Sequence, residues 1–173
     1  MAKLPIIVAP DPRLKVKSKP VAAVDDSIRK LMDDMLESMY GAVGLGLAAI
    51  QVGVPKRIIV MDLAKQGEPA KPLYLVNPEI VAVSDTDRLQ EEGCLSLPGQ
   101  FAEVERPERV EIKYLDYHGK PQRLKAEGML AVCVQHEMDH LEGILFVDHL
   151  SALKRNMILR KLLKQKKLQT AEA

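Results

Sequence analysis

The chain has 173 residues, of which 47% are hydrophobic and 28% are charged, and its formal net charge is +1. These values are typical of one globular domain, expected over 1–173, and no apolar run approaches the roughly 20 residues of a membrane-spanning helix. Two cysteines without a disulfide pattern favour a cytoplasmic location, and an aromatic content of 3% argues against specific DNA binding through base stacking.

The N-terminal part predicts two helical elements. Pro12 favours a short helical turn over 11–14, because proline fits the start of a helix. Asp25 or Asp26 can cap a second helix that ends near Gly41. Apolar residues recur along it at helical spacing, which indicates a stripe that packs in the core. They are Ile28, Leu31, Met32, Met35, Leu36 and Met39.

The middle of the chain predicts β-strands. Three runs rich in strand-forming residues cover 57–61, 73–76 and 79–83. Alternation of polar and apolar residues over 109–115 indicates a further strand. A turn at His118-Gly119 would return it through 122–126 as a hairpin.

A helix expected from about Gly128 to Glu142, closed by Gly143, carries His136-Glu137-Met138-Asp139-His140. This is an H-E-x-x-H motif, and residues four apart share one helical face about 5.4 Å apart, so both imidazoles can bind one metal ion. Glu137 can stay outside the coordination sphere and take a proton from a metal-bound water. The motif therefore predicts metal-dependent hydrolysis of a carbonyl compound.

The third metal ligand distinguishes the classes of enzyme that use this motif, because catalytic zinc-type sites usually have three protein ligands. One protease pattern requires a histidine where the chain has Phe146. Another requires a downstream glutamate, and beyond Glu142 only Glu172 remains, in a polar tail. Neither protease pattern is completed.

Four further donors remain: Cys94, Cys133, His118 and His149. Cys133 shares the helical face, but a site containing it would span roughly 10 Å of helix, so we expect it to be buried core. His149 follows the helix without a marking motif, and His118 lies in the expected turn. Cys94 is favoured by its context, beside a glycine in a segment that we expect to end at Pro98-Gly99.

Three segments together are similar to the peptide deformylase family: residues 44–51 (GLGLAAIQ), 92–96 (EGCLS) and 135–141 (QHEMDHL). They match the family's three motifs in order, and the opening residues 6–14 are also similar. The resemblance covers nearly the whole chain. It implies a bacterial-type, metal-dependent enzyme that removes the formyl group from N-formylmethionyl nascent peptides.

The resemblance also implies a role for individual residues. Cys94, His136 and His140 would bind the metal ion, and Glu137 would act as the general acid and base. The oxyanion would be bound by the Gln51 side-chain amide and the Leu95 backbone N–H. Glu92 and Arg106 would form an ion pair that supports the ligands.

Substrate binding is expected along an apolar, glycine-containing surface. Its residues are Gly44, Leu45, Gly46, Met129, Val132 and Cys133, where an apolar wall suits a methionine side chain. Phe101 stands where some family members have an arginine, which argues against a charged contact with the outer part of the peptide.

Thiolate and imidazole ligands suit Zn²⁺, whereas the resemblance implies Fe²⁺ as the working ion, with Zn²⁺, Ni²⁺ or Co²⁺ as substitutes. Two alternatives use the same motif: a zinc endopeptidase, and a non-catalytic metal-binding module. For the fold we expect the α+β class, with antiparallel β-sheets packed around a central metal-binding helix and a C-terminal helix.

The C-terminal segment 151–173 is strongly basic, with seven basic residues and one acidic residue, a net +6. Residues 1–150 contain 18 basic and 23 acidic residues, a net −5. This asymmetry suggests an anionic partner for the segment. The family resemblance implies that this partner is the ribosome, near the nascent-chain exit. The alternative interpretation, in which the segment is a helix that packs on the domain through an apolar stripe, is at least as well supported. That stripe would contain Leu153, Met157, Leu159, Leu162, Leu163 and Leu168.

Overall fold

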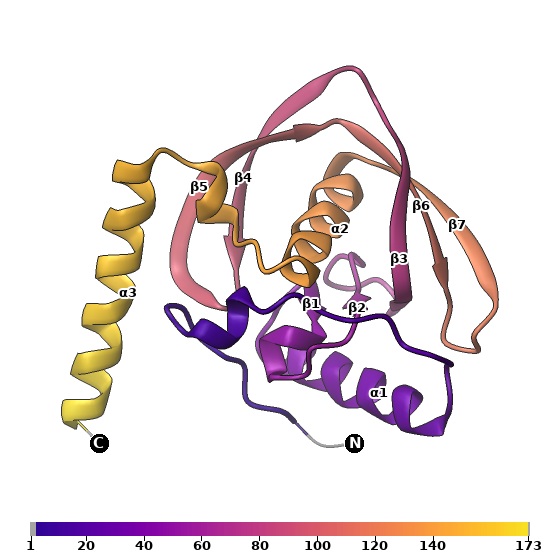
Figure 1. The fold of residues 1–173 in the computed structure, drawn as a ribbon, viewed down its shortest axis with the longest axis horizontal. Coiled ribbons are helices and arrows are strands. Elements are labelled where there is room, and N and C mark those ends of the chain that lie inside the picture. The colour runs from indigo at the N-terminus through magenta and orange to yellow at the C-terminus, as the bar shows by residue number, and fades with distance from the viewer. Residues whose placement is uncertain (1–2, 173) are drawn as a thin grey trace.

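Two antiparallel sheets lie on either side of the helix that carries the H-E-x-x-H motif (Figure 1). The computed structural model describes residues 3–172, so Met1, Ala2 and Ala173, which the expected domain includes, lie outside the described residues. In chain order the elements are η1 (Pro12–Lys15), α1 (Asp26–Gly41), β1 (Gly46–Ala48), η2 (Ala49–Val52), β2 (Ile58–Met61), β3 (Leu73–Val83), β4 (Asp87–Cys94), β5 (Leu97–Pro107), β6 (Arg109–Leu115), β7 (Pro121–Glu127), α2 (Gly128–Leu141), η3 (Phe146–His149) and α3 (Ala152–Glu172).

The expected α+β fold with a central helix and a C-terminal helix is confirmed. One sheet has the strand order β1-β2-β3-β6-β7, and β4 and β5 form a separate two-stranded ribbon. Every strand pair in both sheets is antiparallel. The expected hairpin is β6–β7, which pairs Arg109 with Glu127 at one end and Leu115 with Pro121 at the other.

The β4–β5 ribbon was not predicted, and the expectation that Pro98-Gly99 ends its segment is wrong. The strand β5 continues through both residues to Pro107. Pairing shifts from Gly93 with Phe101 to Cys94 with Leu97, so β5 has three more residues than β4 at this point. Proline is tolerated there because an edge strand with a bulge does not need every backbone N–H for pairing.

The helix α1 confirms the predicted cap and stripe. The Asp25 carboxylate accepts a hydrogen bond from the Ile28 N–H at 3.0 Å. The buried side of the helix packs on β1 and β2 and forms one core cluster with them. Its most buried members are Ile28, Met32, Met35 and Met39.

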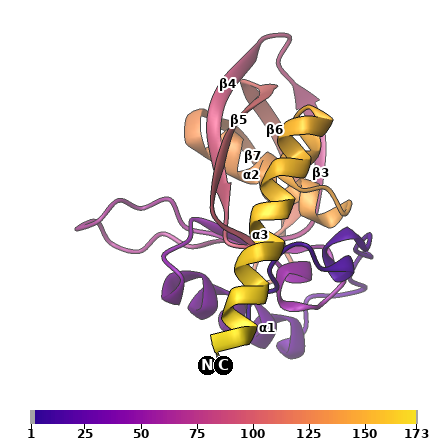
Figure 2. The same ribbon diagram turned by 90° about the vertical axis from the view of Figure 1, so that its left-hand side faces the viewer.

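The helix α3 contacts η3 and β5, and it lies along one side of the molecule (Figure 2). Leu162 is buried, and the Arg155 guanidinium donates to Asp148 at 2.9 Å. The expectation of a docked apolar stripe is wrong for most of its members, because Leu153, Met157, Leu163 and Leu168 are exposed. Among residues 3–172, no helix is long and apolar enough to cross a membrane.

The end of α2 depends on Gly143, as the sequence predicted. Gly143 has a φ of +75°, and the Ile144 N–H donates to the Asp139 carbonyl at 2.9 Å, which closes the last turn. A Cβ atom at Gly143 would lie 2.4 Å from the Lys15 carbonyl oxygen. The site therefore requires glycine both for its backbone conformation and for its close approach to the N-terminal segment.

We expect Gly143→Ala to lower the free energy of unfolding by about 2–4 kcal/mol, through backbone strain and the clash with Lys15. Gly67→Ala is the matched control, because Gly67 has a φ of +88° and a Cβ atom there would meet nothing within 4 Å. It should cost only about 1–2 kcal/mol. Urea unfolding followed by circular dichroism measures both, and equal losses would contradict the clash.

Candidate metal centre and active site

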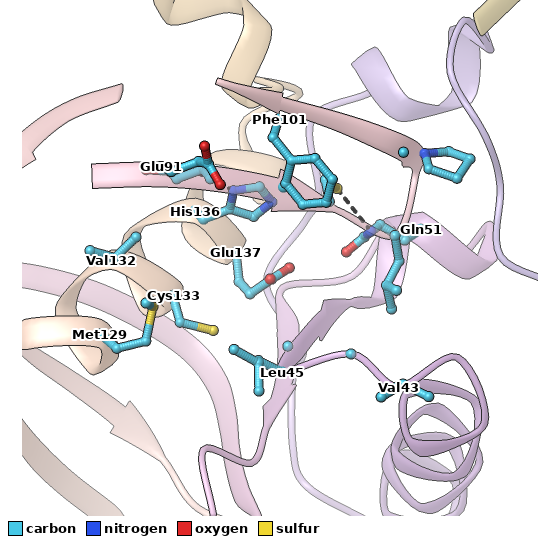
Figure 3. A pocket seen from close by; sticks show the side chains of 18 residues that line it. Val43, Leu45, Gln51, Glu91, Phe101, Met129, Val132, Cys133, His136 and Glu137 are labelled. Atoms are coloured by element: carbon cyan, nitrogen blue, oxygen red, sulfur yellow. Dashed lines mark hydrogen bonds and ion pairs between the residues drawn. The ribbon is translucent and has the colours of Figure 1, made fainter. Parts of the chain in front are cut away.

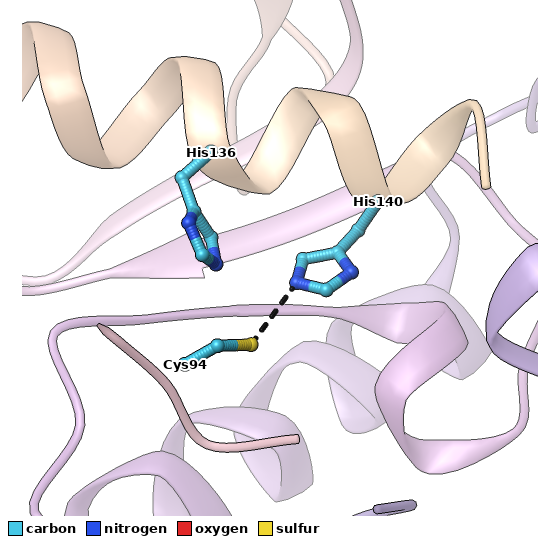
Figure 4. Close-up of side chains that lie close together, drawn as sticks. All are labelled: Cys94, His136 and His140. Atoms are coloured by element: carbon cyan, nitrogen blue, oxygen red, sulfur yellow. Dashed lines mark hydrogen bonds between the residues drawn. The ribbon is translucent and has the colours of Figure 1, made fainter. Parts of the chain in front are cut away.

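Cys94, His136 and His140 form a group that can hold a metal ion (Figure 4). The ligating atoms all lie within 4.8 Å of one another, and the Cys94 Sγ lies 3.3 Å from the His140 Nε2. The histidines lie one turn apart on α2, and Cys94 ends β4. The two protein elements therefore supply the three donors from opposite sides.

This group fits a divalent cation. Bonds of about 2.0–2.3 Å from one tetrahedral ion keep its ligand atoms roughly 3.3–3.8 Å apart, and the distance of 3.3 Å between the Cys94 Sγ and the His140 Nε2 falls in this range. Burial holds the pKa of His140 well below its usual range, which favours the neutral imidazole that binds metals. Burial also opposes protonation of His136, but the Cys94 sulfur and the Glu92 carboxylate outweigh it and raise that pKa. The sulfur and the carboxylate thus place negative charge around His136, whereas His140 stays neutral.

A buried charge network holds His136. Its Nδ1 lies 3.0 Å from the Glu92 carboxylate, which directs the other ring nitrogen toward Cys94. Arg106 donates to both oxygens of Glu92, at 2.6 and 2.9 Å, and to Asp139 at 2.8 Å. The expected pair of Glu92 and Arg106 is therefore formed, and Asp139 extends it onto α2.

Glu137 is buried beside this group. Its Oε1 has no hydrogen-bond partner among the residues that the structure describes, and burial raises the pKa of this carboxyl group to about 7. A Cβ atom on Gly46 would lie 2.7 Å from the Glu137 Oε2 and 2.9 Å from the Cys133 Sγ. Gly46 thus leaves the space in which the Glu137 carboxylate lies.

The Gln51 side chain has a fixed orientation. Its Oε1 accepts a hydrogen bond from the Ala48 N–H at 2.9 Å, so its amide nitrogen points the other way. That nitrogen donates to the Ser96 Oγ at 3.0 Å and lies 3.6 Å from the Cys94 Sγ. Leu95 lies in the turn between β4 and β5, next to Cys94. Both predicted oxyanion donors are thus brought beside the metal group.

A pocket of about 530 Å³ opens over this group (Figure 3). All six residues predicted to bind substrate line it: Gly44, Leu45, Gly46, Met129, Val132 and Cys133. Burial raises the pKa of the Cys133 thiol well above its usual value, so this side chain is a neutral part of the wall. Val43 and Phe101 lie at the mouth.

The remaining candidate ligands lie elsewhere. His118 is in the β6–β7 turn, where its backbone N–H donates to the Asp116 side chain at 2.9 Å. His149 contacts Asp139, with 2.8 Å between its Nε2 and the carboxylate. Asp139 and Ser96 were missed as supporting residues, although each lies within a recognised motif. Their hydrogen-bond partners are distant in sequence, so only their position beside the predicted metal ligands could have marked them.

Comparison with known proteins decides the family. The family model described as polypeptide deformylase matches residues 3–156. The chain belongs to the peptide deformylase family.

Relatives and solved structures of this family cover the chain almost completely. Peptide deformylase from Phenylobacterium zucineum is 59% identical over 167 residues, which are 96% of this chain and 99% of that protein. The one from Maricaulis maris is 58% identical over 100% of this chain and 99% of that protein. A crystal structure of peptide deformylase from Ehrlichia chaffeensis has a TM-score of 0.93 and 44% identity, covering 98% of this chain and 99% of that chain.

The chain is therefore a hydrolase of the peptide deformylase type, and such enzymes are metal-dependent. The two alternatives, a zinc endopeptidase and a non-catalytic metal-binding module, are not supported. The family assignment agrees with a metal group completed by Cys94 rather than by a downstream glutamate or histidine.

We expect Arg106→Met to lower the free energy of unfolding by about 3–5 kcal/mol, because it leaves two carboxylates without their buried cation. Lys113→Met is the matched control, since it breaks an exposed pair with Glu79 and should cost less than about 1 kcal/mol. Urea unfolding of the metal-loaded proteins tests this. If Arg106→Met lowers the free energy of unfolding no more than the control does, the network does not stabilise the fold.

Proposed function

We propose that this chain removes the formyl group from N-formylmethionyl peptides with one divalent cation held by Cys94, His136 and His140. The observation that carries the proposal is the position of Glu137. Its buried carboxylate lies beside the three ligands at the inner end of an apolar pocket. When bound, the cation supplies Lewis-acid chemistry that activates water and polarises a carbonyl oxygen.

Glu137 acts as the general base and then as the general acid. It accepts a proton from the attacking water, whose oxygen bonds to the formyl carbon. The carbon–nitrogen bond then breaks, and Glu137 passes the proton to the departing amine nitrogen, so formate and a free amino terminus leave. A carboxyl pKa of about 7, raised by burial, suits a group that both accepts and donates a proton near neutral pH.

Gln51 and the Leu95 backbone N–H stabilise the negative charge that develops on the formyl oxygen. The Ala48 N–H fixes the Gln51 amide with its nitrogen toward the metal group, so no reorientation is needed during the reaction. Ser96 accepts from the same nitrogen and supports this orientation.

The apolar wall selects methionine. Leu45, Met129, Val132 and Cys133 present no charged group to the pocket, which suits a flexible thioether side chain. Gly44 and Gly46 allow the peptide backbone to approach the wall closely. A Cβ atom on Gly44 would lie 2.5 Å from the Leu95 side chain, so glycine at this position leaves room for that side chain.

Fe²⁺ is the proposed working ion, with Zn²⁺, Ni²⁺ or Co²⁺ as substitutes. One thiolate and two imidazoles are borderline-soft donors that bind each of these ions. Cys94 is partly exposed, which makes an iron–thiolate site sensitive to oxygen. The proposed location is the cytoplasm, where formylated nascent chains arise and thiols stay reduced.

We expect anaerobically purified protein to contain iron and to release formate from formyl-Met-Ala-Ser. Glu137→Gln should keep the metal and lower kcat by about 10²–10⁴, and Gln51→Ala should lower it by about 10²–10³. Glu142→Gln is the control, because this side chain pairs with Lys17 and Arg57 on the surface.

Formate release and metal content are measured on the same samples. Bound metal without formate, even after iron reconstitution, would contradict the proposal. Cleavage of an internal bond in a blocked peptide without a formyl group would instead support an endopeptidase.

The helix α3 is proposed to bind the ribosome near the nascent-chain exit. It carries the basic residues that give segment 151–173 its net charge of +6, and most of them are exposed. Its apolar residues are also largely exposed, so the helix has surface that its own fold does not cover. A surface of this kind attracts polyanions, and ribosomal RNA is a polyanion.

We expect Lys161→Glu with Lys164→Glu to weaken ribosome binding roughly tenfold or more at low salt and to reduce its salt dependence. Lys113→Glu with Lys125→Glu makes the same change of charge on the β6–β7 hairpin and should have little effect. Co-sedimentation with ribosomes at several salt concentrations measures both. Equal weakening by the two pairs would show that only the overall charge matters.

A further inference from the structure

His149 has no part in the proposed reaction, yet its ring contacts the charge network behind the metal group. It ends η3, and its side chain is 36% exposed. Its Nε2 lies 2.8 Å from the Asp139 Oδ2. A carboxylate oxygen only accepts hydrogen bonds, so the Nε2 carries the hydrogen and donates it. His149 therefore joins the network as a hydrogen-bond donor.

A continuous series of side chains leads from His149 to His136. The Asp139 Oδ2 that faces His149 also accepts from the Arg106 Nη1 at 2.8 Å. Arg106 donates to both oxygens of Glu92, and one of these lies 3.0 Å from the His136 Nδ1. The partner of this second ring nitrogen orients a metal-binding imidazole. Each member of the series therefore helps to orient the His136 ring.

The two ends of this series differ in their exposure to solvent. The side chains of Glu92 and Arg106 are 3% and 6% exposed, whereas that of Asp139 is 24% exposed. Water can therefore compete for the Asp139 carboxylate, but hardly for the buried pair. Arg106 holds this carboxylate from the inside, and His149 holds it from the outside. His149 thus opposes the rotation of Asp139 toward solvent.

The turn η3 gives His149 a fixed position. The Asp148 carboxylate, next to His149, accepts from the Arg155 guanidinium at 2.9 Å. At the start of the turn, Phe146 is buried, and its ring stacks on that of His136 with 6.1 Å between the centroids. The turn therefore packs directly against one predicted metal ligand and also reaches the same ligand through the charge network.

We propose that His149 is a positioning residue of the metal centre, which acts through Asp139 and Arg106 on the orientation of His136. The proposal rests on the proposed function, which makes His136 a metal ligand. With His149 in place, Arg106 is held on both sides and Glu92 stays on the His136 Nδ1. Without this donor, Asp139 can turn toward solvent, and the His136 ring gains freedom that metal binding must restrict. Loss of His149 should therefore lower metal affinity.

The test measures the dissociation constant of Zn²⁺ by competition with a chromophoric chelator. His149→Leu removes the donor and should weaken Zn²⁺ binding roughly tenfold, as the loss of a supporting hydrogen bond does. His149→Gln places an amide N–H near the position of the Nε2 and should stay within about threefold of the original protein. His118→Leu is the matched control, because His118 is an exposed histidine in the β6–β7 turn, and it should leave the affinity unchanged.

A double-mutant cycle with Asp139→Ala tests whether His149 acts through this carboxylate. If it does, His149→Leu should change Zn²⁺ affinity by less than about twofold in the Asp139→Ala background. A full tenfold loss in both backgrounds would overturn the proposal. So would Zn²⁺ binding by His149→Leu that is as tight as in the original protein. Equal weakening by His149→Leu and His149→Gln would show that the hydrogen bond is not what matters.

Failure of the proposed function is recognised separately. Zn²⁺ binding is measured without substrate, so a protein that released no formate would still give an answer. If Cys94→Ala binds Zn²⁺ as tightly as the original protein, the proposed metal site is wrong, and urea unfolding of the metal-free proteins decides instead. The decreases in unfolding midpoint caused by His149→Leu and Asp139→Ala should then be non-additive. Additive decreases would overturn the positioning role.

Discussion

The buried ion pairs of Arg106 determine how the two halves of the site meet. Arg106 lies on β5, and it contacts Glu92 two residues before Cys94 and Asp139 one residue before His140. The guanidinium thus joins the ribbon to the central helix beside the ligands that each provides. Buried ion pairs contribute little net stability, but they impose geometry because each charge requires its partner. The metal group therefore depends on a contact that includes none of its ligands.

Close backbone approach is the second requirement of this site. Glu137 can lie beside the metal group because Gly46 has no side chain at that point, and Leu95 can lie over Gly44 for the same reason. Both glycines belong to the segment that enters and forms β1, which packs against α2. The pocket is thus formed where a strand that begins at a glycine passes the helix that carries His136 and Glu137. Its inner part is tightly constrained, whereas its mouth has exposed apolar residues.

The sequence predicted the elements whose signals are local. The cap of α1, the β6–β7 hairpin and the end of α2 at Gly143 each depend on residues a few positions apart, and each is found where expected. The β4–β5 ribbon was missed because its polar strands face solvent and contain proline and glycine, which usually indicate turns. The apolar residues of α3 form a helical pattern, but periodicity does not show whether a partner surface exists within the same chain.

The sequence by itself determined the chemistry of the site, because H-E-x-x-H fixes two donors and a carboxylate on one helix, whatever the rest of the fold. Sequence context favoured Cys94, and the family motifs supported it and supplied Gln51 by resemblance, since spacing along the chain cannot show that β4 passes α2. Only the tertiary structure decided that the Gln51 nitrogen faces the metal group and that Asp139 links Arg106 to the helix. These features arise from contacts between distant segments, which local sequence patterns do not encode.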